Sequence, residues 1–417
     1  MNLLVTSINR PPAYSLAKAL SPMFKEVHGT SPMSFKLLGR LGRVFKRIHH
    51  ISRPSGRTQS HEDAKEVLDY ATKLLHLCER LGVSHILPTQ DIDIIATALH
   101  RDLFAKSRVV VVSPPADVIR PALDKAAVAK RALEVGFPTP STEVISSVEH
   151  ALHVAQSFEY PVVIKATPSM GSEGVRLVSD AETLKVVIPA LQSAYDTVIM
   201  QEYIPGTKER SVNILLDADG KAICGFALKK FRYIHPSWST SIEIFEPEEL
   251  LEQTAKFLRS LGLRGFCAVQ MKLDERDGRY KLIEVNPRFG ANSRILLSRY
   301  PEMATQHFQA MTTKDSGNNV DMPDKFGVSF LDDILSFLVF LIAKTKKKKN
   351  ELSASLPSLV DFAKSYIKTY RQRPFLDDYT KAFLKDPAFA IIFLICLVRY
   401  ESNPPKHWRR FLSWGEV

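Results

Sequence analysis

The sequence predicts a parallel α/β domain followed by an α+β region, with a mostly helical segment at the C-terminal end. Up to about residue 135, apolar strands alternate with helical patterns, which is typical of a parallel sheet covered by helices. From about residue 140, short strands are separated by acidic and glycine-containing turns, which indicates antiparallel sheet with helices between. We expect three domains, at 1–115, 116–312 and 313–417.

The N-terminal elements follow one another as strand and helix. No basic residue precedes the first apolar run, and that run is too short for a signal peptide. The turn after it lacks GxGxxG, so a dinucleotide site is not indicated. The expected strands are 3–5, 85–89 and 108–112, and the expected helices begin near Pro12 or cover 62–81, 91–105 and 116–135.

The middle of the chain is richer in strands. Its apolar runs are separated by polar or glycine-containing turns, and the polar stretch at 312–319 looks like a linker. The expected strands lie at 160–166, 175–179, 197–204, 211–217 and 221–230 and within 266–286.

The composition is that of an ordinary soluble protein. Of 417 residues, 45% are hydrophobic and 24% are charged, which argues against a disordered chain, collagen or a coiled coil. The four cysteines lie far apart and form no CxxC pair, which argues against a disulfide scaffold and a zinc ribbon and favours a reducing cytoplasm. The net charge of +11 indicates an anionic partner, such as nucleotide, phosphorylated substrate, membrane surface or nucleic acid.

The strongest cluster of chemically useful residues is QMKLDERDGRYKLIEVNPRFG, at 270–290. Glu284 and Asn286 are two apart on an expected strand, so their side chains point to one face. With Gln270 on the preceding strand, three oxygen-bearing side chains share that face. Hard oxygen ligands suit Mg²⁺, which usually takes one or two carboxylates together with substrate phosphates. Arg288 follows at once and could hold a phosphoryl group, whereas an exposed polar hairpin face is the alternative.

The register of this hairpin follows from its expected turn. A three-residue loop ending at Gly278, with this glycine in the left-handed region, pairs Glu275 with Arg279. Counting back along both strands, the same register pairs Gln270 with Glu284.

A second cluster is VVIKATPSMGSEGV, at 162–175. Lys165 ends an apolar strand, and a loop rich in glycine and serine follows it. A lysine beside free backbone N–H groups can cradle phosphates. The lysine precedes the loop, so the segment is not a Walker A motif, and a flexible hairpin loop is the alternative.

A third cluster is VIMQEYIPGTKERSV, at 198–212. An apolar strand runs into a Pro-Gly turn and then reaches Glu209. The backbone at 202–204 could pair with a purine edge, and a carboxylate could bind ribose hydroxyls. Taken alone, the segment is a strand and a turn.

In this order and spacing, the three clusters resemble the ATP-grasp superfamily, and most closely the ATP-grasp unit of the carbamoyl-phosphate synthase large subunit, whose Q…ExNPR arrangement they match. D-alanine–D-alanine ligase and the D-aspartate ligase-like carboligases are also similar. The resemblance implies a pre-ATP-grasp domain followed by an ATP-grasp fold, over about 1–312. D-alanine–D-alanine ligases carry aspartate where Gln270 stands, which favours the synthase-like branch. The synthase has two such units and a glutaminase partner, so we do not expect carbamoyl phosphate synthesis by this chain alone.

The resemblance also implies roles for individual residues. Gln270, Glu284 and Asn286 correspond to ligands of Mg²⁺ or Mn²⁺, and Arg288 to a catalytic arginine at the phosphoryl group. Lys230, in ALKKFR, corresponds to a basic residue near the γ-phosphate, with Arg232 as the alternative. The residues implied to hold ATP are Lys125 and Lys165, the loop residues Ser169, Gly171, Ser172 and Gly174, the adenine-hinge residues Gln201, Glu202, Tyr203 and Ile204, and the ribose-binding Glu209.

The function implied is ATP-dependent ligation of a carboxylate to an amine through an acyl phosphate. The expected cofactors are ATP and Mg²⁺, and the expected partners are small-molecule substrates, with no nucleic acid and with a homodimer as the assembly. Alternatives are a carboligase with a non-amino-acid acceptor, such as bicarbonate, and a membrane-associated nucleotide-binding scaffold without turnover.

Two regions are not explained by the resemblance. Residues 36–57 hold seven basic residues and no acid, and a helix there would be basic and amphipathic. Such a helix would bind an anionic membrane or substrate, whereas the alternative is an insertion that packs on the domain. The apolar runs at 334–343 and 388–398 are shorter than the roughly 20 residues that span a membrane. A buried helical hairpin, peripheral docking on the cytoplasmic face of an anionic membrane, and true spanning are the alternatives for these runs.

Overall fold

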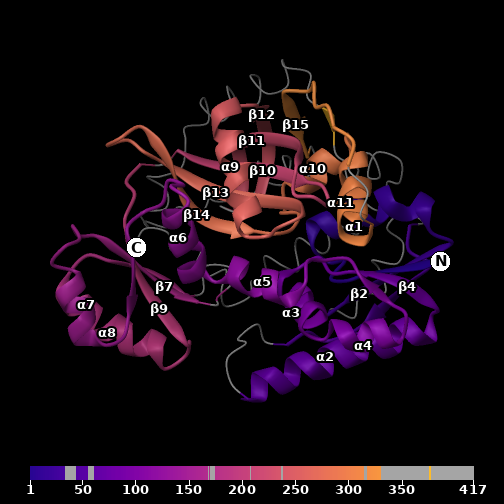
Figure 1. Ribbon diagram of the computed structural model, residues 1–417, viewed down its shortest axis with the longest axis horizontal. Helices are drawn as coiled ribbons and strands as arrows, with labels where there is room; N and C mark the ends of the chain where they lie inside the picture. The colour runs from indigo at the N-terminus through magenta and orange to yellow at the C-terminus, as the bar shows by residue number, and fades with distance from the viewer. Residues whose placement is uncertain are drawn as a thin grey trace, which may run out of the picture.

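The computed structural model describes residues 1–32, 44–54, 61–167, 169, 174–206, 208–235, 238–313, 317–329 and 375–376. Within these residues the strands form three sheets (Figure 1). We call them the N-terminal sheet, the small sheet and the large sheet. The described residues contain no helix long and apolar enough to cross a membrane.

The N-terminal sheet is parallel, as the strand–helix alternation predicts, and its strand order is β3-β2-β1-β4-β5. Its central strand, with the sequence NLLV, is apolar at three consecutive positions because helices cover both faces of the sheet. The order reverses between β1 and β4, and their carboxyl ends form the topological switch point. The strands are β1 (Asn2–Val5), β2 (Glu26–Ser31), β3 (Arg47–His50), β4 (Val83–Leu87) and β5 (Val110–Val111), and the helices are α1 (Pro11–Leu20), the 3-10 turn η1 (Ser21–Met23), α2 (His61–Arg80), α3 (Asp91–Leu99) and α4 (Arg101–Lys106).

Two expected helices are each broken into two. The expected helix at 91–105 is interrupted at His100, whose ψ of 25° leaves the helical region. The expected helix at 116–135 ends at Asp124, which has an extended backbone and separates α5 (Ala116–Leu123) from α6 (Lys125–Glu134). The Asp124 carboxylate accepts a hydrogen bond from the backbone N–H of Ala126 at 2.8 Å, so this aspartate starts a new helix by capping it.

The basic segment at 36–57 is not an amphipathic helix where the structure describes it. Residues 47–50 form β3, an edge strand of the N-terminal sheet. Phe45 and Ile48 pack against the buried core, as the alternative of a packed insertion requires. Residues 36–43 and 55–57 lie outside the described residues.

The small sheet is antiparallel and has the order β6-β9-β7-β8. Two helices, α7 (Val148–Val154) and α8 (Ala181–Gln192), pack on it and bury a core of its own (Figure 1). Its strands are β6 (Thr142–Ile145), β7 (Val162–Thr167), β8 (Val175–Val178) and β9 (Thr197–Glu202).

The large sheet has the order β14-β13-β10-β11-β12-β15-β16, and α9 (Glu248–Ser260) covers one face. On the other face lie α10 (Ser293–Leu297), α11 (Glu302–Thr312) and α1. The sheet continues beyond the expected linker at 312–319, because β15 and β16 add to its edge. Its strands are β10 (Glu209–Leu216), β11 (Ala222–His235), β12 (Trp238–Phe245), β13 (Gly265–Asp274), β14 (Arg279–Asn286), β15 (Phe326–Val328) and β16 (Phe375–Leu376).

The C-terminal segment was expected to be mostly helical. Its described residues include the short strands β15 and β16 and no helix. Both apolar runs, 334–343 and 388–398, lie outside the described residues.

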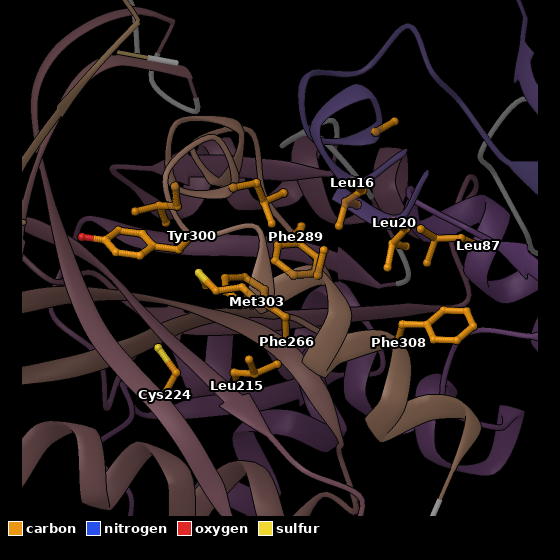
Figure 2. Packing of buried hydrophobic residues seen from close by; sticks show 14 of the residues in the cluster. Leu16, Leu20, Leu87, Leu215, Cys224, Phe266, Phe289, Tyr300, Met303 and Phe308 are labelled. Carbon is orange, nitrogen blue, oxygen red and sulfur yellow. The ribbon is translucent and has the colours of Figure 1, made fainter. Parts of the chain in front are cut away.

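One continuous apolar core joins the N-terminal sheet to the large sheet (Figure 2). Leu16 and Leu20 of α1 and Leu87 of β4 lie in the same buried cluster as Phe266 and Phe289. The rings of Phe266 and Phe289 stack with their centroids 4.1 Å apart. The switch point of the N-terminal sheet is therefore held in a fixed position against the end of β14.

Candidate active site

A cavity of about 80 Å³ lies where the three sheets approach one another. Its walls come from α3 of the N-terminal domain, from α5 and α6, from the small-sheet strands β7 and β9, and from β14 of the large sheet. Of the residues predicted from the sequence, those that line it are Lys125, Lys165, Ser169, Gln201, Glu284, Asn286 and Arg288.

Two lysines, Lys165 buried and Lys125 partly buried, give this cavity positive charge. Lys125 is the first residue of α6, and its ammonium donates to the carbonyl oxygen of Ser169 at 2.9 Å and to the Ser169 hydroxyl at 3.2 Å. Lys165 lies on β7 and is only 6% exposed. Burial lowers the pKa of both lysines, that of Lys165 to about 8, although the nearby Glu284 carboxylate opposes the shift. An anionic ligand would favour the charged form of both lysines, so the site suits phosphate.

The predicted oxygen ligands meet as the hairpin register requires. Gln270 pairs with Glu284 across β13 and β14, and Asn286 pairs with Ala268. The route to this register differs from the prediction, because Asp274 rather than Glu275 pairs with Arg279.

A register shift next to Gln270 compensates for the different turn. The turn is one residue longer than expected, with Gly278 in the left-handed region at φ 71°. The irregularity between Gln270 and Met271 then restores the expected pairing at Glu284. A bulge beside a functional residue re-aims its side chain, and here it places the amide and the carboxylate on one face.

The contacts of Gln270 leave its oxygen for a ligand. The side-chain nitrogen of Gln270 donates to the hydroxyl of Ser211 at 3.1 Å. The remaining amide oxygen, the Glu284 carboxylate and the Asn286 amide oxygen form an all-oxygen donor set that suits a hard divalent cation. These residues fit the implied Mg²⁺ or Mn²⁺ site.

The predicted adenine hinge is only partly at the cavity. Gln201 is 5% exposed, and its amide nitrogen donates to the Thr142 hydroxyl at 2.9 Å. The side chain of Glu202 instead forms ion pairs with Arg276 and Lys281, which tie β9 to the β13–β14 hairpin. Its backbone N–H donates to the carbonyl oxygen of Ser141, so a purine would have to use other backbone groups.

The other nucleoside residues lie outside the walls of the cavity. Tyr203 has the ammonium of Lys272 over its ring at 5.0 Å, and Ile204 is buried. Glu209 is exposed and pairs with Lys272 across β10 and β13. Glu202, Tyr203, Ile204, Glu209 and Gln270 therefore do not line the 80 Å³ space.

The predicted phosphate loop is described at its two ends. The Ser169 hydroxyl donates to the carbonyl oxygen of Ala166 at 2.7 Å, and the backbone N–H of Ala166 donates to the carbonyl oxygen of Gly174 at 2.8 Å. A Cβ atom on Gly174 would lie 2.8 Å from the Ser169 hydroxyl oxygen, so only glycine fits. Gly171 and Ser172 lie outside the described residues.

Lys230 lies on β11 opposite Ile242. Its side chain, like that of Arg232, lies outside the described part of the chain, so the role implied for either residue stays a prediction.

The structure adds one acidic residue that the motifs did not indicate. Asp91 begins α3 just after β4 and makes a two-point ion pair with Arg288, including a 2.8 Å contact between its Oδ2 and Nη2. The same Nη2 donates to the Asn286 amide oxygen at 3.3 Å. Burial alone would lower the pKa of Arg288, but the Asp91 carboxylate raises it. The sequence held one indication of a role for Asp91. This residue lies in the segment TQDID, after a predicted parallel strand, and the carboxyl ends of such strands beside a switch point are where ligands bind.

Comparison with known proteins identifies the central part of the chain. Residues 124–298 match the family model described as "Carbamoyl-phosphate synthase L chain, ATP binding domain". The N-terminal section of the carbamoyl phosphate synthase large chain of Methanopyrus kandleri is 27% identical over 231 residues, which cover 53% of this chain and 38% of that protein. The mitochondrial arginine-specific large chain of Schizosaccharomyces pombe is 25% identical over 237 residues, which cover 54% of this chain and 20% of that protein. The match thus spans well under half the length of these relatives.

Solved structures show the same fold. The biotin carboxylase domain of Hydrogenobacter thermophilus 2-oxoglutarate carboxylase has a TM-score of 0.58 and 16% identity, with coverage of 77% of this chain and 70% of that one. N5-carboxyaminoimidazole synthetase of Staphylococcus aureus has a TM-score of 0.57 and 12% identity, with coverage of 83% and 86%. Residues 124–298 therefore match an ATP-binding domain of the carbamoyl-phosphate synthase large-chain type, and the chain shares the ATP-grasp fold of these solved structures.

Proposed function

We propose that this protein is an ATP-dependent ligase that joins a carboxylate to an amine and releases ADP and phosphate. The observation that carries the proposal is the composition of one cavity, which is lined by the partly buried Lys125, the buried Lys165 and the Glu284 carboxylate. Such a site balances polyphosphate and a divalent cation at the same time. The match to an ATP-binding family domain over residues 124–298 supports it.

The proposed roles rest on position for the residues that line the cavity and on the family resemblance for the others. Lys125, Lys165 and the loop ends at Ser169 and Gly174 hold the phosphates of ATP, while Gln201 closes the end of the cavity towards the purine. The other proposed nucleoside contacts are Glu202, Tyr203, Ile204 and Glu209, and Lys230 is proposed near the γ-phosphate.

The metal ligands in this scheme are Gln270, Glu284 and Asn286. When bound there, Mg²⁺ or Mn²⁺ would supply Lewis-acid neutralisation of the phosphate oxygens. The protein's own contribution is to place three oxygen-bearing side chains on one face of the hairpin.

The reaction needs no nucleophilic side chain. A carboxylate oxygen of the substrate attacks the γ-phosphorus of ATP, the bond from that phosphorus to the bridging oxygen breaks, and ADP leaves. The amine nitrogen then attacks the acyl carbon, the bond to the phosphate breaks, and phosphate departs with one oxygen of the original carboxylate. Arg288 would neutralise the phosphoryl group during transfer, and the enzyme acts by alignment and charge compensation.

The test is ATP turnover with Mg²⁺ and hydroxylamine across a panel of amino acids, other carboxylates and bicarbonate. Hydroxylamine replaces the unknown amine and converts an acyl phosphate to a hydroxamate. We expect a hydroxamate with one carboxylate, and loss of it in Glu284→Ala. Bicarbonate-dependent ADP release without any hydroxamate from an organic acid would favour the non-amino-acid carboligase, and nucleotide binding without turnover would favour the scaffold.

The cellular setting is also a proposal. We propose a cytoplasmic enzyme that forms a homodimer, and light scattering of the purified chain measures that assembly. Docking on the cytoplasmic face of an anionic membrane would rest on the apolar runs at 334–343 and 388–398. Co-sedimentation with anionic vesicles that is lost on deletion of 313–417 would support the docking, and an intact chain that stays in the supernatant would contradict it.

A further inference from the structure

We infer that Asp91 of the N-terminal domain is a positioning residue for the phosphoryl-binding arginine, Arg288. This inference rests on the proposed function, because it assumes that Arg288 meets the transferring phosphoryl group. Asp91 lies outside the nucleotide and metal motifs of the chain. The inference therefore gives a segment of the N-terminal sheet domain a direct part in building the site.

The first step is the geometry of the ion pair. Asp91 uses both carboxylate oxygens, with Oδ1 accepting from Nε and Oδ2 accepting from Nη2 of Arg288. Such a two-point contact fixes the plane of the guanidinium as well as its position. The side chains are only 12% and 20% exposed, so solvent screens this contact weakly.

The second step concerns the N–H donors of Arg288 that the ion pair with Asp91 does not engage. Nε and Nη2 are engaged by Asp91, and Nη2 also donates to the amide oxygen of Asn286. Among the residues that the structure describes, Nη1 of Arg288 makes no hydrogen bond. Its two N–H groups are the donors left for a ligand, and Arg288 and Asn286 both line the cavity.

The third step is the rigidity of the loop that carries Asp91. Thr89, two residues before it, donates two hydrogen bonds to Thr6, just after β1: from its backbone N–H to the Thr6 hydroxyl at 3.1 Å and from its hydroxyl to the Thr6 carbonyl oxygen at 2.9 Å. Asp93, two residues after it, is fully buried and accepts from the hydroxyls of Thr6 at 2.6 Å and Tyr70 at 2.8 Å. The carboxylate of Asp91 is thus held from both sides by the switch point of the N-terminal sheet.

Together these contacts explain why a site for anions keeps a carboxylate against its arginine. An unpaired arginine side chain must lose much rotamer freedom when it binds phosphate. In our proposal, Asp91 already restricts the rotamers of Arg288 in the folded protein, so less freedom is lost when phosphate binds. It also leaves one edge of the guanidinium directed at the phosphoryl group. The opposite reading is that Asp91 competes with phosphate for Arg288, and the two readings predict opposite effects of removing the carboxylate.

The test compares binding of two nucleotides by calorimetry in the full chain: the β,γ-imido analogue of ATP and ADP, each with Mg²⁺. The ratio of the two affinities isolates contacts to the third phosphate. We expect Asp91→Ala and Arg288→Ala each to lower this ratio by about tenfold, the value of a charge-assisted hydrogen bond. The double variant should lower it no further, since Asp91 acts only through Arg288.

Two further variants separate positioning from folding. Asp91→Glu keeps the charge and should restore most of the ratio, whereas Asp91→Asn should not. Asp102→Asn is the matched control, because Asp102 is an exposed acid in the first turn of the neighbouring helix α4. It should leave the ratio unchanged, and thermal unfolding checks that every variant is folded.

The inference is overturned if Asp91→Ala leaves the ratio unchanged or raises it, or if the two losses multiply in the double variant. An unchanged ratio in Arg288→Ala also overturns it, because the arginine would then not meet the third phosphate. Failure of the proposed function looks different: without a nucleotide site the unaltered protein would bind neither nucleotide, and without ligase turnover the hydroxylamine assay would fail while the affinity ratio could still be measured.

Discussion

Replacement of Lys165 by methionine should stabilise the nucleotide-free protein while it removes nucleotide binding. Lys165 is 6% exposed, and its pKa falls from the ordinary 10.5 to about 8, chiefly because burial disfavours the charged form. Each pH unit of this difference corresponds to about 1.4 kcal/mol, so the charged ammonium costs the fold about 3 kcal/mol at pH 7. Methionine is unbranched and apolar and fills a similar volume without that cost.

The pH dependence gives the effect its own signature. Between pH 8 and 10.5 the unfolded state binds more protons at this lysine than the native state does, so the stability of the unaltered protein rises with pH in that window. At pH 9.5 the advantage of Lys165→Met should therefore shrink to about 1.4 kcal/mol.

Thermal unfolding at pH 7 and pH 9.5 without nucleotide measures the stability, and calorimetry with MgATP measures the binding. Lys185→Met is the control, because Lys185 lies on α8 with its side chain 48% exposed. This change should alter neither the stability nor the MgATP affinity much. A Lys165→Met protein that is less stable at pH 7, or that binds MgATP as tightly as the unaltered chain, would refute the reasoning.

Three further predictions concern the loop after β7, the β13–β14 hairpin and the metal ligands. Gly174→Ala should weaken MgATP binding at least several-fold and lower the melting temperature, because its methyl group would collide with Ser169 2.8 Å away; a calorimetric affinity equal to that of the unaltered chain would contradict this. Asp274→Asn should cost about 1–3 kcal/mol in urea unfolding at pH 7, because this 1% exposed carboxylate pairs with two cationic side chains. Those cations hold the pKa of Asp274 below its ordinary value. The difference in unfolding free energy between the unaltered protein and Asp274→Asn should therefore narrow, and should not widen, as the pH falls below 4. Glu284→Gln should abolish the dependence of nucleotide affinity on Mg²⁺ concentration, and a retained dependence would remove Glu284 from the metal site.

The β13–β14 hairpin shows which structural features the sequence pattern predicted and which it did not. The spacing of Gln270, Glu284 and Asn286 predicted one face and one register, and both are present. The turn itself was wrong by one residue, and the structure corrects it with a register shift beside Gln270. Alternation along a strand is a local property that sequence encodes strongly, whereas a bulge depends on how two strands meet.

Helix breaks were missed for a similar reason. The apolar pattern over 116–135 is continuous, but Asp124 caps a second helix and so places Lys125 at the cavity. An aspartate in a helical pattern can lie inside one continuous helix or can cap the start of a second helix. Tertiary contacts decide between these two structures. The family resemblance singled out Lys125 but did not indicate the helix break that places it at the cavity.

Contacts between distant segments lay beyond any pattern. Asp91 reaches Arg288 across 197 positions of sequence, and Arg276 reaches Glu202 across 74. These partners become visible only when the N-terminal sheet and the hairpin are placed against the other elements. For residues 36–57 the sequence left an amphipathic helix and a packed insertion as alternatives, and the edge strand at 47–50 fits the packed insertion.

The most direct test of the proposed ligase follows one oxygen atom. A carboxylate substrate found by the hydroxylamine panel is labelled with ¹⁸O in its carboxyl group and incubated with MgATP and its amine. The account predicts that the released phosphate carries one ¹⁸O per turnover, because the carboxylate oxygen that attacks the γ-phosphorus leaves with it. Phosphate without label would contradict an acyl phosphate and with it the central claim.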